Sequence, residues 1–423
     1  MSRSIVPLSS NLVPYDSDTF LVRFARKMIS NQLQKIENGE LVLRDGRNEM
    51  YFGKTTTDFA SPIYIDIKHP SFYIDVAFGG SSGSGEAYMK GSWECSDLLA
   101  LIRLFLRNRH VLTDMDFSLT RLKGPIHKIA HLFNRNTRLG SKKNISAHYD
   151  IGNDLFELFL DPTMMYSSAY YSKQEMTLEQ ASTAKLDLVC KKLELGPGDH
   201  LLEIGTGWGG LAIHAAANYG CQVTTTTISD EQFNLAKARI RDNGLEDKIT
   251  VLKQDYRDLD GQYDKLVSIE MIEAIGHQYM HTYFEKCCSL LKPDGMMLIQ
   301  AITIKDQLYK DALKDVDFIK KYIFPGGFLP SINSMIDAIN GKTDMKLFHL
   351  QDIGPHYAKT LHDWRKRFFG KLDEIRNLGY SDEFIRLWEY YFCYCEGGFI
   401  ERDIGTVQMV LTRPENRREP LML

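Results

Sequence analysis

Short apolar stretches and amphipathic stretches alternate along the chain from about Asp187 onward. The apolar stretches have the length of strands, and the stretches between them carry apolar residues at helical spacing. The expected strands are "HLLEIG", "CQVTTTTIS", "KITVLKQD", "YDKLVSIE" and "GMMLIQAITI", and the expected helices are "GLAIHAAANYG" and "DEQFNLAKARIRDNG", which ends at Gly244. Strands and helices in alternation form a parallel sheet with helices on both faces. The pattern therefore predicts an α/β fold.

The pattern in residues 1–120 differs and predicts a separate, smaller α+β domain. The segment "SPIYIDIKHPSFYIDVAF" (Ser61 to Phe78) alternates apolar and polar residues, which predicts two strands broken at His-Pro. The next segment, "GGSSGSGEAYMKGSWEC", predicts a glycine-rich turn, a short strand and another turn. The segment "SDLLALIRLFLRNR" predicts an amphipathic helix capped by Ser96.

A basic segment, residues 121–145, is expected to link this domain to a larger domain of residues 146–423. No acidic residue lies between Asp116 and Asp150. The basic residues there are Arg121, Lys123, Lys128, Arg135, Arg138, Lys142 and Lys143. Apolar residues at helical spacing lie among them, which suits binding to an anionic membrane surface. A solvated linker is the alternative, and nucleic-acid binding is less favoured because no recognition motif is present.

Composition narrows the class of protein. A chain of 423 residues is comfortable for two domains, and 43% hydrophobic with 25% charged residues is ordinary for a globular protein. The net charge of −4 excludes no partner by itself. The seven cysteines have no CxxC spacing, which favours a reducing compartment without disulfides or a zinc site. With no secretory signal and no apolar run of about 18 residues, we expect a cytoplasmic protein that binds membranes only peripherally.

A glycine-rich turn, "GTGWGG" from Gly205 to Gly210, joins the first expected strand of the larger domain to a helix. Such a turn leaves backbone N–H groups free at the start of a helix and lets a ligand approach closely. The GxGxxG spacing alone suits any dinucleotide. Here Glu203 precedes the turn, where its carboxylate can bind an amine or a ribose.

The ends of two further strands change the prediction from a dinucleotide to another cofactor. The second strand ends in Thr227, Ile228 and Ser229, followed by Gln232, without the acidic residue that usually binds a ribose. The fourth strand ends in "SIEMIE", which places Glu270 and Glu273 at the carboxyl edge of the sheet, where open α/β sheets bind ligands. This arrangement is that of a methyltransferase that uses S-adenosylmethionine.

Motifs along nearly the whole chain resemble the cyclopropane-fatty-acyl-phospholipid synthase family. They are "GSGEAYMKGSWEC", "ISAHYDIGNDLFELFLDPTMMYSSAYY", "EIGTGWGG", "TISDEQ", "QDYRDL", "EMIEAIG", "DFIKKYIFPGGFLPS", "PHYAKTL" and "CEGGFIERDIGTVQMV". The last third is most similar to the catalytic domain of plant-type members. The resemblance implies a class I methyltransferase domain, Rossmann-like with a mostly parallel seven-stranded sheet. It also implies that the N-terminal domain binds lipid and forms a homodimer.

The resemblance implies a set of residues that contact S-adenosylmethionine, with Tyr256 and Arg257 beside the adenine. The others, besides Glu203, are Tyr166, Ser167, Gly205, Thr206, Gly207, Trp208, Thr227, Ile228, Ser229 and Gln232.

Members of the family add a methylene group across a cis double bond of a phospholipid acyl chain. The methyl donor must lie in line with the alkene at roughly 3–3.5 Å. The carbocation that forms needs a dry pocket, and aromatic faces can stabilise it. Candidates for this lining, with ordinary core packing as the alternative for at least half, are Tyr166, Tyr170, Tyr283, Phe318, Tyr322 and Phe328.

The resemblance implies that a bound bicarbonate ion then removes a proton so that the ring closes. Its expected ligands are Ser168, Glu273, Gln300, the backbone of Ile302, and Tyr357. The best-known bacterial members have Cys in place of Ser168 and His in place of Gln300. Ser and Gln still bind anions by hydrogen bonds, but Gln cannot carry positive charge.

These two differences leave the product open. A cyclopropane ring is expected, and a methyl-branched or methylene-bearing acyl chain is the alternative. A lipid-binding protein without activity and a methyltransferase of small molecules are less favoured. Cys395 matches a cysteine often called active in the family, yet no step needs a covalent intermediate, and a lone Cys among aromatic residues is more often a buried apolar residue.

Overall fold

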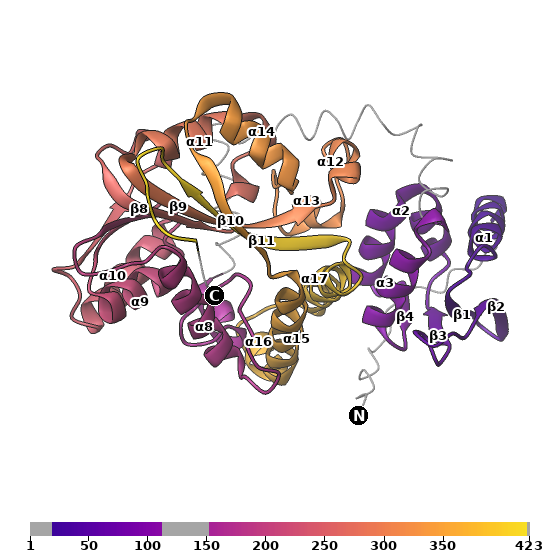
Figure 1. Cartoon of the computed structure of the whole chain (residues 1–423). Helices are drawn as coiled ribbons and strands as arrows, with labels where there is room; N and C mark the ends of the chain where they lie inside the picture. The colour runs from indigo at the N-terminus through magenta and orange to yellow at the C-terminus, as the bar shows by residue number, and fades with distance from the viewer. Residues whose placement is uncertain (1–18, 112–151, 421–423) are drawn as a thin grey trace. The chain divides into compact units, whose positions relative to one another are not determined.

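The computed structural model describes residues 19–111 and 152–420. The chain divides into two compact units, the first comprising residues 1–124 and 382–390, the second residues 125–381 and 391–423 (Figure 1). The sequence did not predict that residues 382–390, from the start of helix α17 (Asp382–Ile400), belong to the first unit. The predicted basic linker, residues 121–145, lies outside the described residues and stays a prediction.

The first unit is an α+β arrangement around a four-stranded sheet with strand order β2-β1-β3-β4. Strand β1 pairs with β2 antiparallel and with β3 parallel. Besides the start of α17, its elements are α1 (Phe20–Leu33), β1 (Gly39–Asp45), β2 (Asn48–Lys54), β3 (Ile63–Ile67), α2 (Ser71–Met89), β4 (Trp93–Cys95) and α3 (Leu98–Arg107).

Helix α2 replaces the second strand, the glycine turn and the short strand that were predicted after His69, so that prediction was wrong. The alternation there is compatible with a helix because Phe72, Tyr73 and Val76 also share one helical face, and all three are buried. The glycines permit a kink and close packing. Gly80 has φ 56°, and a Cβ on Gly83 would lie 2.0 Å from the carbonyl oxygen of Asp75. Tertiary burial therefore outweighs the helix-weakening effect of glycine.

The helix predicted around residues 96–109 is confirmed as α3, but its cap was wrong by one residue. The side chain of Asp97 accepts a 2.9 Å hydrogen bond from the N–H of Ala100. Ser96 instead accepts from the N–H of Tyr64, at 3.1 Å, and so ties the start of the helix to strand β3.

The second unit holds a seven-stranded sheet with order β10-β11-β9-β8-β5-β6-β7. Its strands are β5 (His200–Ile204), β6 (Gln222–Thr227), β7 (Ile249–Lys253), β8 (Tyr263–Ile269), β9 (Leu291–Ile304), β10 (Lys346–Asp352) and β11 (Ile404–Thr412). Strands β9, β8, β5, β6 and β7 are parallel, whereas β11 pairs antiparallel with β9 and with β10. The predicted α/β fold with a mostly parallel sheet is confirmed.

Helices cover both faces of this sheet. They are α7 (Asn153–Phe159), α8 (Leu178–Lys192), α9 (Gly210–Tyr219), α10 (Asp230–Asp242), α11 (Met280–Ser289), α12 (Asp306–Ala312), α13 (Phe318–Tyr322), α14 (Ile332–Lys342), α15 (Gly354–Gly370), α16 (Leu372–Asn377) and the rest of α17. Short 3-10 helices are η2 (Tyr256–Asp258), η3 (Ile272–Ala274) and η4 (His277–Tyr279).

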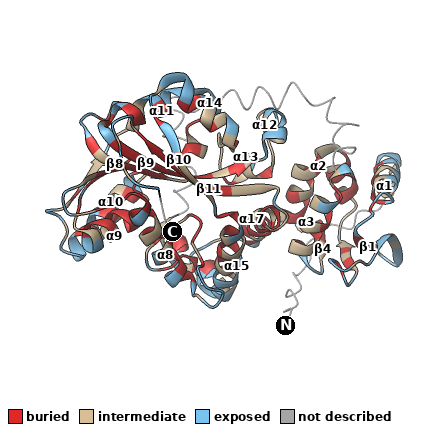
Figure 2. Cartoon of the chain, in the orientation of Figure 1, coloured by how far each residue is buried: buried red, intermediate tan, exposed pale blue. Residues whose placement is uncertain are grey.

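Successive strand residues face opposite helical layers, which is why the strands are continuous apolar runs. Leu201 and Val267 lie in a core cluster with residues of α8, α9 and α10. Their neighbours Leu202 and Leu266 lie in a second cluster with residues of α11 and α14. Figure 2 shows the sheet buried between these layers. Both faces of the sheet are therefore covered by helices, as is usual for a parallel sheet.

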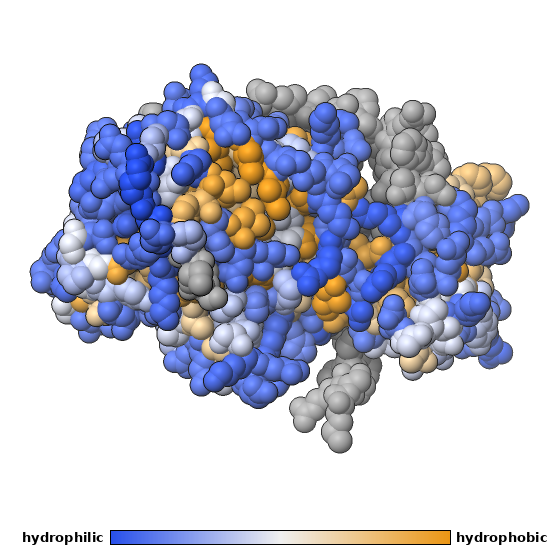
Figure 3. Space-filling view, viewed as in Figure 1, coloured by the Kyte–Doolittle hydropathy of each residue, from blue (hydrophilic) through white to orange (hydrophobic). Residues whose placement is uncertain are grey.

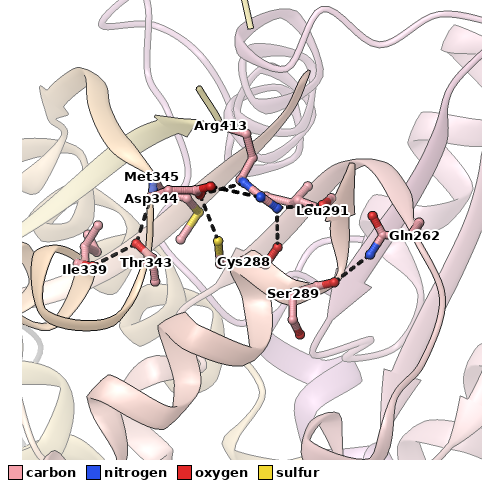
Figure 4. Close-up of polar contacts among 9 residues, drawn as sticks. All are labelled: Gln262, Cys288, Ser289, Leu291, Ile339, Thr343, Asp344, Met345 and Arg413. Atoms are coloured by element: carbon pink, nitrogen blue, oxygen red, sulfur yellow. Dashed lines mark hydrogen bonds and ion pairs between the residues drawn. The ribbon is translucent and has the colours of Figure 1, made fainter. Parts of the chain in front are cut away.

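Arg413, just after β11, connects the end of α11, the start of β9 and the residue Asp344 before β10 (Figure 4). Its Nη1 donates to the carbonyl oxygens of Cys288 and Leu291, each at 2.9 Å. Its Nε lies 2.7 Å from Oδ1 of Asp344, which also accepts from the thiol of Cys288 at 3.3 Å. The arginine thus donates to a carbonyl group in the last turn of α11, where helical donors run out, and to one at the start of β9.

The edge strand β10 has no fully buried residue, and Figure 3 shows hydrophobic residues gathered around it on this face of the second unit. Lys346 and Asp352 place charges at its two ends, which opposes pairing with a further strand. Among residues 19–111 and 152–420, none of the helices has the length and hydrophobicity needed to cross a bilayer.

Candidate active site

The glycine turn after β5 lies where the sequence predicted it, but its hydrogen bonds differ. Gly205 has φ 104°, a conformation that favours glycine. The N–H groups of Gly205 and Thr206 both donate to the carbonyl oxygen of Thr226, at 3.1 and 3.0 Å. The prediction of free N–H groups was therefore wrong for these two residues, which instead fix the turn to β6.

Glu203 lies under this turn at the end of β5 and is buried. Its Oε2 accepts a 2.6 Å hydrogen bond from the hydroxyl of Thr225. Burial raises the pKa of Glu203 to about 8, although the same hydrogen bond and the nearby Lys185 act against the shift. A cationic amine bound here would favour the ionised carboxylate, which suits the amino-acid end of S-adenosylmethionine.

The polar residues that follow β6 form hydrogen bonds with one another. The hydroxyl of Thr227 donates to Oε1 of Gln232 at 2.8 Å and accepts from the N–H of Ser229 at 3.2 Å. Ser229 caps α10 by accepting from the N–H of Gln232. The oxygen of Gln232 is thus used, whereas its NH₂ group can donate to a ligand. Ile228 lies between Thr227 and Ser229 and carries no polar side chain.

The adenine side of the predicted site follows β7. Arg257 makes two hydrogen bonds to Asp255, at 2.8 and 2.6 Å, and this fork fixes the loop. Tyr256 packs edge-on against Tyr283, with ring centroids 5.4 Å apart. The ends of β5, β6 and β7 are neighbours in the sheet, so these residues share one edge with the glycine turn.

The segment before α8 carries Tyr166 and Ser167. The hydroxyl of Tyr166 donates to that of Tyr391 at 3.0 Å, and Ser167 accepts from Nζ of Lys185 at 3.0 Å. Lys185 is fully buried, which lowers its pKa to about 8. Trp208 donates from its indole nitrogen to Asn153 at 2.7 Å.

Glu270, directly after β8, is the centre of a hydrogen-bonded cluster. Its Oε1 accepts from the backbone N–H of Ser168 at 3.0 Å and from Nε2 of Gln300 at 2.7 Å. Its Oε2 accepts from the hydroxyl of Tyr357 at 2.8 Å. Burial raises the pKa of Glu270, while these three donors oppose the shift. The hydroxyl of Ser168 points elsewhere and donates to the carbonyl oxygen of Ala169.

Glu273, one turn further along, has a different environment. Its Oε1 accepts from the N–H of Ile302 at 2.6 Å, whereas its Oε2 is buried without a hydrogen-bond partner. Burial, and next the charge of Glu270, raise the pKa of Glu273 to about 8. At neutral pH Glu273 is therefore mostly protonated, so the two carboxyl groups do not carry two full negative charges.

A buried polar chain fixes the orientation of Gln300. Its Oε1 accepts from Nε2 of Gln408, which lies opposite it on β11, at 2.9 Å. Oε1 of Gln408 accepts in turn from Nζ of Lys192 at 2.7 Å. An ammonium group can only donate, so both amides are oriented and the NH₂ of Gln300 faces Glu270.

The residues expected to bind bicarbonate are thus brought together, but their donors are already used. Ser168, Gln300 and Tyr357 all donate to Glu270, and Ile302 donates to Glu273. A further anion would have to compete with the carboxyl groups of Glu270 and Glu273 for these donors, at close range to both. The described residues therefore fit S-adenosylmethionine, but they do not fit a bicarbonate ion in addition.

Cys395 lies near the cluster without the properties of a nucleophile. Burial, and next the charge of Asp317, raise the pKa of its thiol and disfavour the thiolate. Among the aromatic candidates, Phe328 is joined to the backbone of Glu273, since its N–H donates to the carbonyl oxygen of Glu273 at 3.0 Å. Tyr283 is fully buried in the core cluster under α11.

Sequence reasoning missed the central position of Glu270 and the buried cations Lys185 and Lys192. The sequence places Glu270 at the carboxyl edge of the sheet, but it does not indicate a role for this residue. The two lysines lie on one face of α8 among buried residues. A charged residue on a buried helical face was the signal that could have found them.

Comparison with known proteins agrees with this geometry. The family model described as mycolic acid cyclopropane synthetase matches residues 137–409. A cyclopropane-fatty-acyl-phospholipid synthase of Escherichia coli is 39% identical over 366 residues, covering 84% of this chain and 89% of that protein. The tuberculostearic acid methyltransferase UfaA1 of Mycobacterium tuberculosis is 34% identical over 404 residues, covering 92% of each. The solved structure of the mycolic acid cyclopropane synthase CmaA1, complexed with SAH and CTAB, has a TM-score of 0.58 at 32% identity and covers 64% of this chain and 98% of that one.

The fold and the site define a class I methyltransferase that uses S-adenosylmethionine as the methyl donor. Within that class the sequence match is more specific. The chain belongs to the mycolic acid cyclopropane synthetase family.

Proposed function

We propose that the protein transfers a methylene group from S-adenosylmethionine to the cis double bond of an unsaturated phospholipid acyl chain and closes a cyclopropane ring. The observation that carries this proposal is the buried carboxyl group of Glu270, which accepts three hydrogen bonds at the carboxyl edge of β8 and lies near Glu273. Methyl transfer to an oxygen or a nitrogen releases a proton from that heteroatom, which solvent can accept. Methyl transfer to an alkene needs a base at the end of the reaction, because the carbocation must lose a proton.

Residues of this chain are suited to each requirement of that reaction. S-adenosylmethionine would supply the electrophilic methyl group. The segment around Tyr166 and Ser167 and the turn at Gly207 would hold it, with Glu203 on its amine. The ring centroid of Tyr166 lies 5.2 Å from that of Trp364 and 6.4 Å from that of Phe324. Aromatic faces stabilise a cation without reacting with it.

The relatives support an acyl chain as the substrate. The Escherichia coli relative is named a cyclopropane-fatty-acyl-phospholipid synthase, and the alignment covers 84% of this chain. We extend this substrate class to the present protein. We also propose that the phospholipid is presented by an anionic membrane surface to which the basic residues 121–143 bind.

A methyl-branched or methylene-bearing product is the second candidate. It is favoured by Gln300 and Ser168, which differ from the best-known bacterial synthases, and by the similarity to a tuberculostearic acid methyltransferase over 92% of the chain. The same donor, fold and carbocation serve both outcomes. They differ in which proton leaves.

The proposal is tested by substrate discrimination. The purified protein is incubated with S-adenosylmethionine carrying a labelled methyl group and with vesicles of one phospholipid at a time. Vesicles with cis-monounsaturated chains should gain the label in the acyl chain, and vesicles with the matched saturated chains should not. Transfer to the headgroup, or no transfer to any unsaturated lipid, would contradict the proposal.

A further inference from the structure

The three donors on Glu270 identify the chemical state of this residue. The backbone N–H of Ser168 can only donate, and the NH₂ of Gln300 is turned toward Glu270 by the chain through Gln408 to Lys192. Oε1 faces two fixed donors and can therefore act only as an acceptor, and the hydroxyl of Tyr357 can donate to Oε2. We infer from these three contacts that Glu270 is held in its ionised form. Oε1 accepts two of the bonds and Oε2 one, so Oε2 retains a lone pair.

Glu273 cannot play the same part in its resting state. It has a single donor, the N–H of Ile302, and its other oxygen is buried without a partner. A protonated carboxyl group has no free site of sufficient basicity to take a proton from a carbon atom. The two glutamates therefore have different roles, set by their hydrogen-bond partners.

We propose that Glu270 is the catalytic base of ring closure and that its carboxylate takes the place of an external bicarbonate ion. The inference rests on the proposed function, since it assigns a residue to the last step of that reaction. The two oxygens of Glu270 receive the donors of Ser168, Gln300 and Tyr357, the positions expected to surround such an ion.

The proposed step balances. Methyl transfer would break the bond between the methyl carbon and the sulfonium sulfur, and its electron pair would stay on the sulfur of the departing S-adenosylhomocysteine. The electron pair of the double bond would form one C–C bond to the methyl group, which leaves a positive charge on the neighbouring carbon. A C–H bond of the new methyl group then breaks, and its electron pair forms the second C–C bond of the ring. The proton goes to Oε2 of Glu270, which becomes neutral, and later passes to solvent.

The backbone at Glu270 supports a functional reason for this residue. Its φ of 50° lies in the left-handed region, where glycine is favoured and a larger side chain costs about 1 kcal/mol or more. A glycine at this position would relax the backbone and remove the carboxylate, so that the three donors would face free space. The variant Glu270→Gly is therefore expected to fold, and its activity can be compared with that of the unmodified protein.

The experiment compares the full-length protein with Glu270→Gln and Glu270→Gly, and with Glu285→Gln as a control, because Glu285 is an exposed glutamate on α11. Label transfer to cis-unsaturated phospholipid is measured in buffer freed of carbon dioxide and again with added bicarbonate. Binding of S-adenosylmethionine and of ¹³C-bicarbonate is measured separately by calorimetry and NMR.

We expect turnover of the unmodified protein to be independent of bicarbonate and turnover of Glu270→Gln to fall at least about 100-fold with cofactor affinity retained. Glu270→Gly should bind bicarbonate and regain turnover when it is added, and the control should match the unmodified protein. Loss of turnover by the unmodified protein without bicarbonate, or bicarbonate binding to it, would overturn the inference. So would an active Glu270→Gln.

Failure of the proposed function can be distinguished from failure of the inference about Glu270. If no unsaturated phospholipid accepts the label, the bicarbonate-binding comparison still decides whether Glu270 occupies the anion position. Binding to Glu270→Gly alone supports the inference, and binding to the unmodified protein contradicts it.

Discussion

The hydroxyl of Tyr357 on α15 donates a 2.8 Å hydrogen bond to Oε2 of Glu270 at the end of β8. The tyrosine ring stacks on Phe399 of α17, with centroids 4.5 Å apart, so that its hydroxyl is held in place. Burial, and next the charge of Glu270, raise the pKa of Tyr357 well above its ordinary value, which keeps the phenol protonated as a donor. One oxygen of the proposed base is thereby positioned by an element distant in sequence.

Removal of this donor should slow catalysis without loss of the fold. In Tyr357→Phe the ring still packs on Phe399, but Oε2 of Glu270 is no longer held. We expect turnover to fall by about 100-fold, as for other single active-site donors, with unchanged affinity for S-adenosylmethionine. Tyr219→Phe is the matched control, because it loses a hydrogen bond to Asp187 at the far end of α9. Equal activity of the two variants would show that Tyr357 has no part in catalysis.

Substitution of the second glutamate tests a separate role. Glu273→Gln keeps an oxygen that can accept from Ile302, so the loop should stay in place. The amide of the variant cannot give up or take up a proton at neutral pH, however, and its NH₂ group replaces the buried Oε2. We expect turnover to be abolished and the affinity for S-adenosylmethionine, measured by calorimetry, to be nearly unchanged. A fully active variant would show that Glu273 has no part in the mechanism.

The buried glutamates make stability depend on pH with a definite sign. The pKa of Glu273 is raised from 4.5 to about 8 by folding. Between these values the unfolded chain releases a proton that the folded protein keeps, so stability falls as pH rises, by up to about 1.4 kcal/mol per pH unit for one group. Relative to Glu273→Gln, the cofactor-free protein should lose stability from about pH 4.5 to 8 in urea unfolding and change no further above that. A difference that grows above pH 8 would contradict this assignment.

The buried lysine Lys192 should give the opposite slope at higher pH. Burial lowers its pKa from 10.5 to about 8. Between these values the unfolded chain takes up a proton that the folded protein lacks, so stability rises with pH. Relative to Lys192→Met, the unmodified protein should gain stability between about pH 8 and 10.5 in the same assay. A flat difference across that range would show that Lys192 stays charged when folded.

Arg413 should be important for stability and not for chemistry. In Arg413→Met the carbonyl groups of Cys288 and Leu291 and the carboxylate of Asp344 lose their donor. We expect a loss of about 2–3 kcal/mol of unfolding free energy, because hydrogen bonds from a charged group are among the stronger ones. Arg417→Met, on an exposed residue nearby, is the control and should change stability by less than about 0.5 kcal/mol. Equal stability of both variants would contradict the assigned role.

The sequence was sufficient for the larger sheet because its strands carry their own signal. Leu201 and Leu202, or Leu266 and Val267, are apolar in succession since both faces of the sheet are covered. Helix α2 could not be predicted in the same way. Its helical state depends on contacts with other elements, of Tyr73 with Asp45 in β1 and of Tyr88 with Trp93 in β4, whereas local alternation with glycines suggests strands and turns.

The site was predictable in part for a related reason. The glycine turn and the "EMIE" motif are local, and the resemblance supplied Tyr357 and Gln300. The role of Glu270 depends on Tyr357, 87 residues away, and on Ser168, 102 residues away. The orientation of Gln300 depends on Gln408, 108 residues away. No spacing in the sequence encodes such contacts, so this cluster could not be predicted from the sequence and is defined only by the folded structure.

The most direct test of the central claim is the structure of the product. The protein is supplied with cis-monounsaturated phospholipid and S-adenosylmethionine carrying a trideuterated methyl group, and the acyl chains are analysed by mass spectrometry before and after bromination. We predict one added carbon, two retained deuteriums and no addition of bromine across a double bond, which together define a cyclopropane. Three retained deuteriums, or a double bond that still adds bromine, would contradict ring closure and establish a methyl- or methylene-forming enzyme.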